Sequence, residues 1–133
     1  MQSQDYSCVA AASAQALNLL GIKTSERQMA QLTQTRPGTG STTFRAMHGL
    51  NQRLKHSDYT VELLEVSLED LDQLPLPLMT PLQYEPTRRH MVTIKSVSED
   101  VLHVMDPVDG EVMISWNSMK QVFTGEVLVF IQR

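Results

Sequence analysis

The sequence predicts an α+β fold in which helices come first and an antiparallel sheet follows. Up to about residue 54 the apolar side chains recur at helical spacing, whereas residues 59–132 contain short runs rich in Val, Ile, Leu and Met that are separated by turn residues. Helices and strands are segregated rather than alternating, and this favours an antiparallel sheet over βαβ units. With 133 residues, 41% of them hydrophobic, we expect one domain over residues 1–133.

Three helices are predicted in the first part of the chain, and the first is the longest. Its apolar residues recur at helical intervals from Cys8 to Leu20, and Gly21 supplies a C-terminal stop. Its many alanines would let other elements pack closely against it. The other two helices, on either side of a Pro- and Gly-containing loop at residues 36–42, are expected from a Thr24 or Ser25 cap to about Gln34 and from Thr43 to Leu54.

The second part of the chain is predicted to form the sheet. Ser67-Leu-Glu-Asp70 resembles a capping box and would open a short helix to Leu74. Turns are expected at Ser98-Glu-Asp100 and Asp109-Gly110. The predicted strands are Tyr59–Val66, Leu78–Tyr84, His90–Val97, Val101–Met105, Glu111–Ser115 and Glu126–Gln132.

Composition excludes several classes of function. The net charge is −4 and the 11 Lys and Arg residues are scattered, so we expect no nucleic-acid partner. A single cysteine forms no internal disulfide and rules out metal sites built on paired cysteines. No run approaches the roughly 20 apolar residues of a membrane span, and no signal peptide is evident. The sequence does not determine the cellular compartment. The chain could be a domain trimmed from a larger protein or a mature form.

The only cysteine, Cys8, is the first candidate for chemistry. It stands directly ahead of the alanine-rich stretch that is predicted to be helical. A thiol at a helix N-terminus lies near the positive end of the helix dipole, which favours the thiolate and lowers the pKa of the thiol. The alternative is that Cys8 is a small buried hydrophobic side chain, as single cysteines commonly are. A nucleophile also requires a base and a group that orients the base.

His90 and Asp106 are the candidates for these two roles. If residues 90–97 and 101–105 form a hairpin about the turn at 98–100, paired residue numbers sum to about 198, which brings His90 within a residue or two of Asp106. A carboxylate there would hold the imidazole in the required tautomer and stabilise its protonated form. The alternative is a surface His–Asp pair of little energetic weight, and spacing alone does not decide between them.

An oxyanion donor is the remaining requirement of such a site. Gln2 and Gln4 both precede Cys8, and a side-chain amide there could join the backbone N–H of Cys8 in stabilising a developing negative charge. Either glutamine could also be an ordinary surface residue. The other histidines are expected at a solvated surface (His48 and His56) or on an undetermined strand face (His103).

Taken together, the spacing of Gln2, Cys8, His90 and Asp106-Pro-Val-Asp-Gly110 resembles that of the bacteriocin-processing, double-glycine-leader cysteine peptidases. These are papain-like domains at the N-terminus of peptide-exporting ABC transporters, and they also occur as stand-alone proteins. The resemblance covers the whole chain. Its further landmarks are Gly38-Thr-Gly-Ser41, Leu71-Asp-Gln-Leu-Pro-Leu-Pro77, His90-Met-Val and Phe123-Thr-Gly-Glu-Val-Leu128.

The resemblance implies both a mechanism and a papain-like fold with the nucleophile at the start of the first long helix. Carried over by residue, it assigns Cys8 as nucleophile, His90 as general base and then acid, Asp106 as orienting group and Gln2 as oxyanion donor. It implies cleavage after a Gly-Gly pair in a leader peptide through an acyl-enzyme, with no metal or cofactor. Specificity would be largely steric, with a leader helix docked on an apolar patch nearby.

The sequence departs from the family pattern at two places. Ser7-Cys8-Val9 stands where Asp-Cys-Gly is common, and Met91 stands where a bulky aromatic residue usually follows the histidine. Both departures bear on substrate preference, because the four roles remain filled. The alternative functions are a non-cleaving docking domain that binds secretion substrates for an ABC transporter, and another papain-like activity such as amide or acyl transfer.

The implied partners are a peptide with a double-glycine leader and the membrane and ATPase domains of an ABC transporter. A transporter domain would lie at the cytoplasmic face of the inner membrane, whereas a stand-alone enzyme would be periplasmic or secreted.

Overall fold

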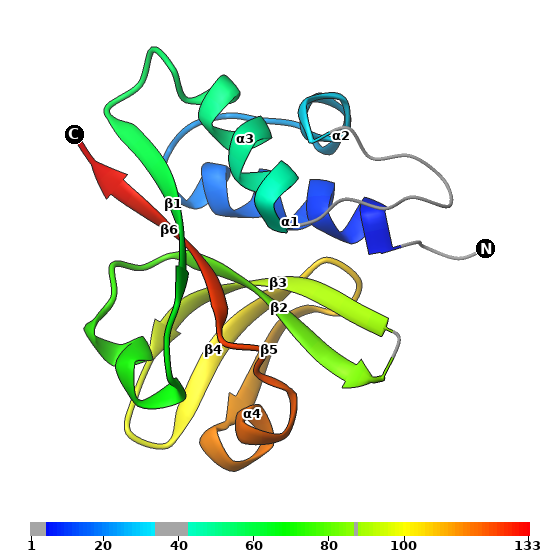
Figure 1. Ribbon diagram of the computed structural model, residues 1–133, viewed down its shortest axis with the longest axis vertical. Helices are drawn as coiled ribbons and strands as arrows, with labels where there is room; N and C mark the ends of the chain where they lie inside the picture. The colour runs from blue at the N-terminus through cyan, green and yellow to red at the C-terminus, as the bar shows by residue number, and fades with distance from the viewer. Residues whose placement is uncertain (1–4, 34–42, 87) are drawn as a thin grey trace.

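The computed structural model describes the backbone at residues 5–33, 43–86 and 88–133, with side chains from Val9 onward except that of Arg88. The helices α1 (Asp5–Leu19), α2 (Glu26–Leu32) and α3 (Thr43–Arg53) lie together on one side of a six-stranded sheet, and a short helix, α4 (Trp116–Val122), lies on the other (Figure 1). The predicted α+β order is confirmed.

Helix α1 carries the cysteine. It begins at Asp5, three residues before the predicted start, so Cys8 lies in the first turn rather than at the first residue. The predicted start of the helix is too far along the chain because Asp5-Tyr6-Ser7 lacks the apolar repeat that marks the rest of the helix. Helix α1 ends at the predicted stop, where the N–H of Ile22 donates to the carbonyl of Leu17 at 2.9 Å and Gly21 has a φ of 84°.

Helices α2 and α3 pack beside α1. The cap of α2 is Ser25 rather than Thr24, because its hydroxyl accepts from the N–H of Gln28 while the Gln28 side chain accepts from the N–H of Ser25. Helix α3 ends one residue before the predicted boundary. The predicted end of the second helix at Gln34 and the loop at 36–42 lie outside the described residues, and the described helix ends at Leu32.

The sheet has the order β1-β6-β2-β3-β4-β5, and each neighbouring pair is antiparallel. The last strand in sequence, β6, therefore lies between β1 and β2, which leaves β1 and β5 at the edges. The strands are β1 (Tyr59–Glu65), β2 (Leu78–Glu85), β3 (Arg88–Val97), β4 (Val101–Asp106), β5 (Gly110–Ser115) and β6 (Glu126–Gln132).

Each face of the sheet packs against its own apolar cluster. On the face covered by α1, residues such as Leu17, Leu50 and Met79 form one core. Leu82, Val104 and Met119 belong to a second core, which α4 closes on the other face. Because successive side chains of a strand point to opposite faces, the central strands contribute residues to both cores.

Two short helices differ from the prediction. Residues Leu68–Gln73 form a 3₁₀ helix, η1, and Ser67 donates its hydroxyl to the Asp70 carboxylate instead of capping a backbone N–H, so the predicted capping box is wrong. Helix α4 was not predicted. Its signal is present in the sequence, since Ser115 accepts from the N–H of Ser118 as an N-cap and the apolar positions recur every three residues.

None of the described helices is long and apolar enough to cross a lipid bilayer.

Candidate active site

His90 and Asp106 meet at one end of the sheet. The pairs Thr93–Met105 and Ile94–Val104 follow the register expected from the hairpin, and an irregularity in β3 shifts the register by one residue beyond Ile94. The imidazole Nε2 of His90 lies 2.8 Å from Oδ2 of Asp106. The two side chains are 16% and 9% exposed, so this pair is largely shielded from water. The predicted contact between the two residues is present, and it is not a solvated surface pair.

Asp106 is fixed by the turn that follows it. Its Oδ1 accepts the backbone N–H of Val108 at 2.7 Å and that of Asp109 at 3.1 Å. Burial raises the pKa of Asp106, but these two backbone donors and the imidazole of His90 together outweigh burial, so the pKa lies below its ordinary value. One carboxylate oxygen is thus held by the backbone while the other faces the imidazole. A carboxylate that stays ionised in this position can orient an imidazole and stabilise its protonated form.

Tyr84 is a neighbour of His90 that sequence reasoning missed. Its ring lies 6.4 Å from the imidazole, centroid to centroid, with an interplanar angle of 48°. Partial burial raises the pKa of Tyr84, and the carboxylates of Asp106 and Asp109 raise it further, so the phenol stays protonated. No sequence signal reveals this contact, because it depends on an irregularity in strand pairing at the end of β2.

The backbone of Cys8 lies toward the same end of the molecule as His90. The buried Thr93 hydroxyl donates to the carbonyl of Ala12 at 3.1 Å, which joins β3 to α1. In Figure 1 both elements begin at the right of the view. Moving back from this contact covers about 6 Å of helix to Cys8 and about 10 Å of strand to His90, in the same general direction. The side chain of Cys8, and Gln2 and Gln4 entirely, lie outside the described residues.

The other three histidines make no hydrogen bond to Asp106 within the described part of the chain. His48 and His56 are exposed, as predicted, and His103 pairs with Met113 on the neighbouring strand. The exposed ion pairs Lys95–Glu111 and Arg89–Glu126, at 3.1 and 3.2 Å, contribute little to stability. Within the described part of the chain, no group of three or more His, Cys, Asp or Glu side chains is arranged to hold a metal ion.

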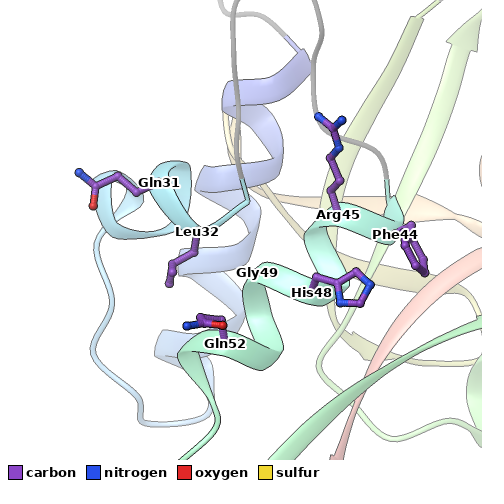
Figure 2. A pocket seen from close by; sticks show the side chains of 7 residues that line it. All are labelled: Gln31, Leu32, Phe44, Arg45, His48, Gly49 and Gln52. Carbon is purple, nitrogen blue, oxygen red and sulfur yellow. The ribbon is translucent and has the colours of Figure 1, made fainter.

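A pocket of about 430 Å³ opens between α2 and α3 (Figure 2). Leu32 contributes an apolar wall. The rings of Phe44 and His48 meet edge to face, with 4.5 Å between their centroids. The other described lining residues are polar or glycine. Neither His90 nor Asp106, the two predicted site residues whose side chains are described, lines this pocket. Its lining residues are Gln31, Leu32, Phe44, Arg45, His48, Gly49 and Gln52.

The fold and the site together define the class of protein. N-terminal helices on one face of an antiparallel sheet, with a His–Asp pair between the start of β3 and the end of β4, are the arrangement expected from the family resemblance. The model of the Peptidase C39 family matches residues 1–133. The chain therefore belongs to the Peptidase C39 family, and the expected family is confirmed. An uncharacterised protein of Methanothermobacter thermautotrophicus is 30% identical over 129 residues, which cover 97% of this chain and 84% of that protein.

Solved structures confirm the papain-like α+β fold. A double glycine motif protease from an AMS/PCAT transporter, crystallised with the leader peptide, has a TM-score of 0.81 and 19% identity, with 100% of this chain and 89% of that chain covered. The peptidase domain of Streptococcus ComA, a bi-functional ABC transporter, has a TM-score of 0.82 and 16% identity, with 99% and 96% covered. At these identities the likeness establishes the fold, and membership of a peptidase family supports a peptidase role.

Proposed function

We propose that this protein is a cysteine peptidase that cleaves a leader peptide after a Gly-Gly pair, and that residues 1–133 form its single peptidase domain. The observation that carries the proposal is the shielded hydrogen bond between His90 and Asp106. The first turn of α1, which contains Cys8, lies toward the same end of the molecule. Membership of the Peptidase C39 family supports the same chemistry.

In the proposed reaction His90 takes the thiol proton of Cys8, and the resulting thiolate attacks the carbonyl carbon of the scissile bond. The backbone N–H of Cys8 and the amide of Gln2 donate to the oxyanion that forms. The C–N bond then breaks as His90 returns the proton to the leaving amine, which leaves an acyl-enzyme. His90 next deprotonates a water molecule, and the attacking hydroxide releases the leader and regenerates the thiol. Asp106 stabilises the imidazolium in both halves of the cycle.

The substrate and partners are proposed on the same basis. A Gly-Gly pair would enter a channel too narrow for side chains, so selection would be largely steric, while the leader would dock as a helix on an apolar surface. Its partners would be the membrane and ATPase domains of an ABC transporter. In support, one of the similar structures is a double glycine motif protease crystallised with the leader peptide.

Cleavage of synthetic leader peptides tests the proposal. The protein should cut a peptide after Gly-Gly and leave a Val-Val counterpart intact, and Cys8→Ala should abolish cutting while the circular dichroism spectrum stays unchanged. His56→Ala is the matched control, because His56 is exposed and lies outside the site. Cleavage by Cys8→Ala at the unaltered rate would overturn the assignment of the nucleophile.

Thiol reactivity separates a peptidase from a domain that only docks its substrate. An activated Cys8 should alkylate with iodoacetamide faster than free cysteine near neutral pH, because the thiolate is the reactive form. Alkylation no faster than that of free cysteine, together with binding of the leader, would indicate a docking domain instead.

A further inference from the structure

Tyr84 of β2 is an unpaired residue whose ring lies beside that of His90. The pairing of β2 with β3 runs regularly to Gln83–Arg89 and then shifts, so that Glu85 rather than Tyr84 pairs with the next residue of β3. Tyr84 is therefore the extra residue of a β-bulge. Bulges often occur beside active sites and re-aim a side chain. The side chain aimed here is 52% exposed, and its ring lies 6.4 Å from that of His90.

The bulge is held by its neighbours. The amide nitrogen of Gln83 donates to the carbonyl of Pro86 at 2.7 Å, which closes the end of the hairpin at the right of Figure 1. Arg89 donates to Gln83 at 3.4 Å and to the carboxylate of Glu126 on β6 at 3.2 Å. These contacts join the residues on either side of the bulge to one another and to β6, and so fix the strand ends between which Tyr84 lies.

If His90 acts as proposed, the position of Tyr84 places its ring next to the part of the substrate that leaves. An imidazole that protonates a leaving amine must lie within hydrogen-bond distance of that amine. It therefore lies against the first residues of the released segment, which is the segment that follows the cleaved bond. A half-exposed ring in contact with that imidazole is placed to touch the same residues. The carboxylate of Asp106 lies 2.8 Å from the imidazole of His90, whose ring centroid is 6.4 Å from that of Tyr84, so its negative charge would repel an acidic residue placed against these rings.

We propose that Tyr84 is a specificity-determining residue that contacts the released segment and favours an apolar residue over an acidic one just after the cleaved bond. This inference rests on the proposed function, since it places the leaving segment against His90. The proposed function requires Gly-Gly just before the cleaved bond. This inference adds a preference for the residue just after that bond. The ring acts by packing, because both faces of a tyrosine ring are apolar.

Binding of the released segment alone tests this contact without any cleavage. The probes are the pentapeptides Leu-Ser-Ala-Ser-Ala and Glu-Ser-Ala-Ser-Ala, titrated into the full chain while His90 ring signals are followed by NMR. The Leu peptide should shift those signals and bind more tightly than the Glu peptide. Tyr84→Ala should weaken binding of the Leu peptide about fivefold, whereas Tyr84→Phe should change it by less than about twofold. Tyr84→Gln, which keeps length without a ring, repeats the measurement should Tyr84→Ala lose its fold.

Met113→Ala is the matched control, because Met113 is 67% exposed on the edge strand β5 and touches neither His90 nor Asp106 in any described contact. It should leave binding unchanged. Equal affinity of the wild type and both ring-deleting variants for the Leu peptide would overturn the inference. So would the absence of any shift at His90 with millimolar peptide.

A cleavage arm distinguishes this inference from the proposed function. With Gly-Gly substrates that differ only in the residue after the bond, the Leu-to-Glu ratio of kcat/KM should fall about fivefold in Tyr84→Ala. A wild type that cuts no substrate refutes the peptidase assignment, while the pentapeptide titration still decides whether Tyr84 selects the ligand. An unchanged ratio in an active variant refutes the role of Tyr84 and leaves the peptidase assignment standing.

Discussion

The imidazole of His90 and the carboxylate of Asp106 are joined at 2.8 Å, although 15 residues separate them along the chain. The hairpin formed by β3 and β4 brings them together, and the turn after β4 fixes Asp106 through two backbone N–H groups. The backbone therefore holds one oxygen of the carboxylate while the other faces the imidazole. This arrangement has a consequence for stability that can be measured apart from any catalysis.

Asp106→Asn should lower the free energy of unfolding by about 1–3 kcal/mol near neutral pH, because a hydrogen-bonded charged group is replaced by a neutral one. The pKa of Asp106 lies below its ordinary value of 3.8. Ionised Asp106 therefore stabilises the fold fully above that value, and the stabilisation is lost as the pH falls below 3.8 toward the pKa of the folded state. Urea unfolding of both proteins between pH 7 and pH 2 should show the difference shrinking over this acidic range.

Asp109→Asn is the control for this pH series. The Asp109 side chain is exposed, and only its backbone N–H reaches Asp106. Its substitution should change stability by less than about 0.5 kcal/mol at each pH. A difference between wild type and Asp106→Asn that is constant down to pH 2 would contradict the role given to the ionised carboxylate.

The sequence predicted the His90–Asp106 contact because a hairpin with a short turn has a simple register. Strand periodicity and the turn at residues 98–100 predict the register to within one residue, and the pairs on the His90 side of the irregularity in β3 have the predicted register. The same reasoning could not predict the contact of Tyr84 with His90. That contact depends on one extra residue in β2, and only Glu85 follows it in the strand, so the change of alternation is too short to be seen in the sequence.

The helices, too, were predicted only where they carry a clear apolar repeat. The apolar repeat predicted the body of α1, but its polar first turn starts earlier than the repeat indicates. Helix α4 was missed although Ser115 provides a recognisable cap, because its seven residues contain only three apolar positions of the repeat, Trp116, Met119 and Val122. The order of strands in the sheet could not be predicted either, since β6 reaches its place between β1 and β2 through pairings that are distant in sequence.

Asn51 joins α3 to the edge strand β1, and its removal should be costly. Its amide nitrogen donates to the carbonyl of Val61 at 3.0 Å, and its oxygen accepts from the N–H of Val61 at 2.8 Å and from the hydroxyl of Thr60 at 3.2 Å. Asn51→Ala leaves these part-buried groups without partners, so the free energy of unfolding should fall by about 2–3 kcal/mol. Gln52→Ala, on the exposed side of the same helix, should change it by less than about 0.5 kcal/mol. Equal chemical denaturation midpoints for the two variants would argue against this link.

Ser13→Ala should stabilise the protein. Ser13 is fully buried in α1, and its hydroxyl has no hydrogen-bond partner among the described residues. Replacing it with alanine removes a buried unsatisfied group and improves helix propensity, so the free energy of unfolding should rise by about 1 kcal/mol. Ser25→Ala makes the opposite comparison, because it removes the N-cap hydroxyl of α2 and should cost about 1 kcal/mol. Thermal melts of the two variants should therefore move in opposite directions, and a lower melting temperature for Ser13→Ala would contradict the assignment.

Gly49 sets the distance between α2 and α3, which face each other across the pocket of Figure 2. A Cβ at this position would lie 2.6 Å from the carbonyl oxygen of Leu32, and backbone atoms cannot move aside without shifting a helix. Gly49→Ala should therefore lower the free energy of unfolding by about 2 kcal/mol or more, despite a gain of about 1 kcal/mol in helix propensity. Gly21→Ala is the comparison, because it meets no atom within 4 Å and incurs only the strain of a positive φ of 84°, about 1–2 kcal/mol. In urea unfolding, a Gly49→Ala variant as stable as the wild type would show that the two helices can separate without loss.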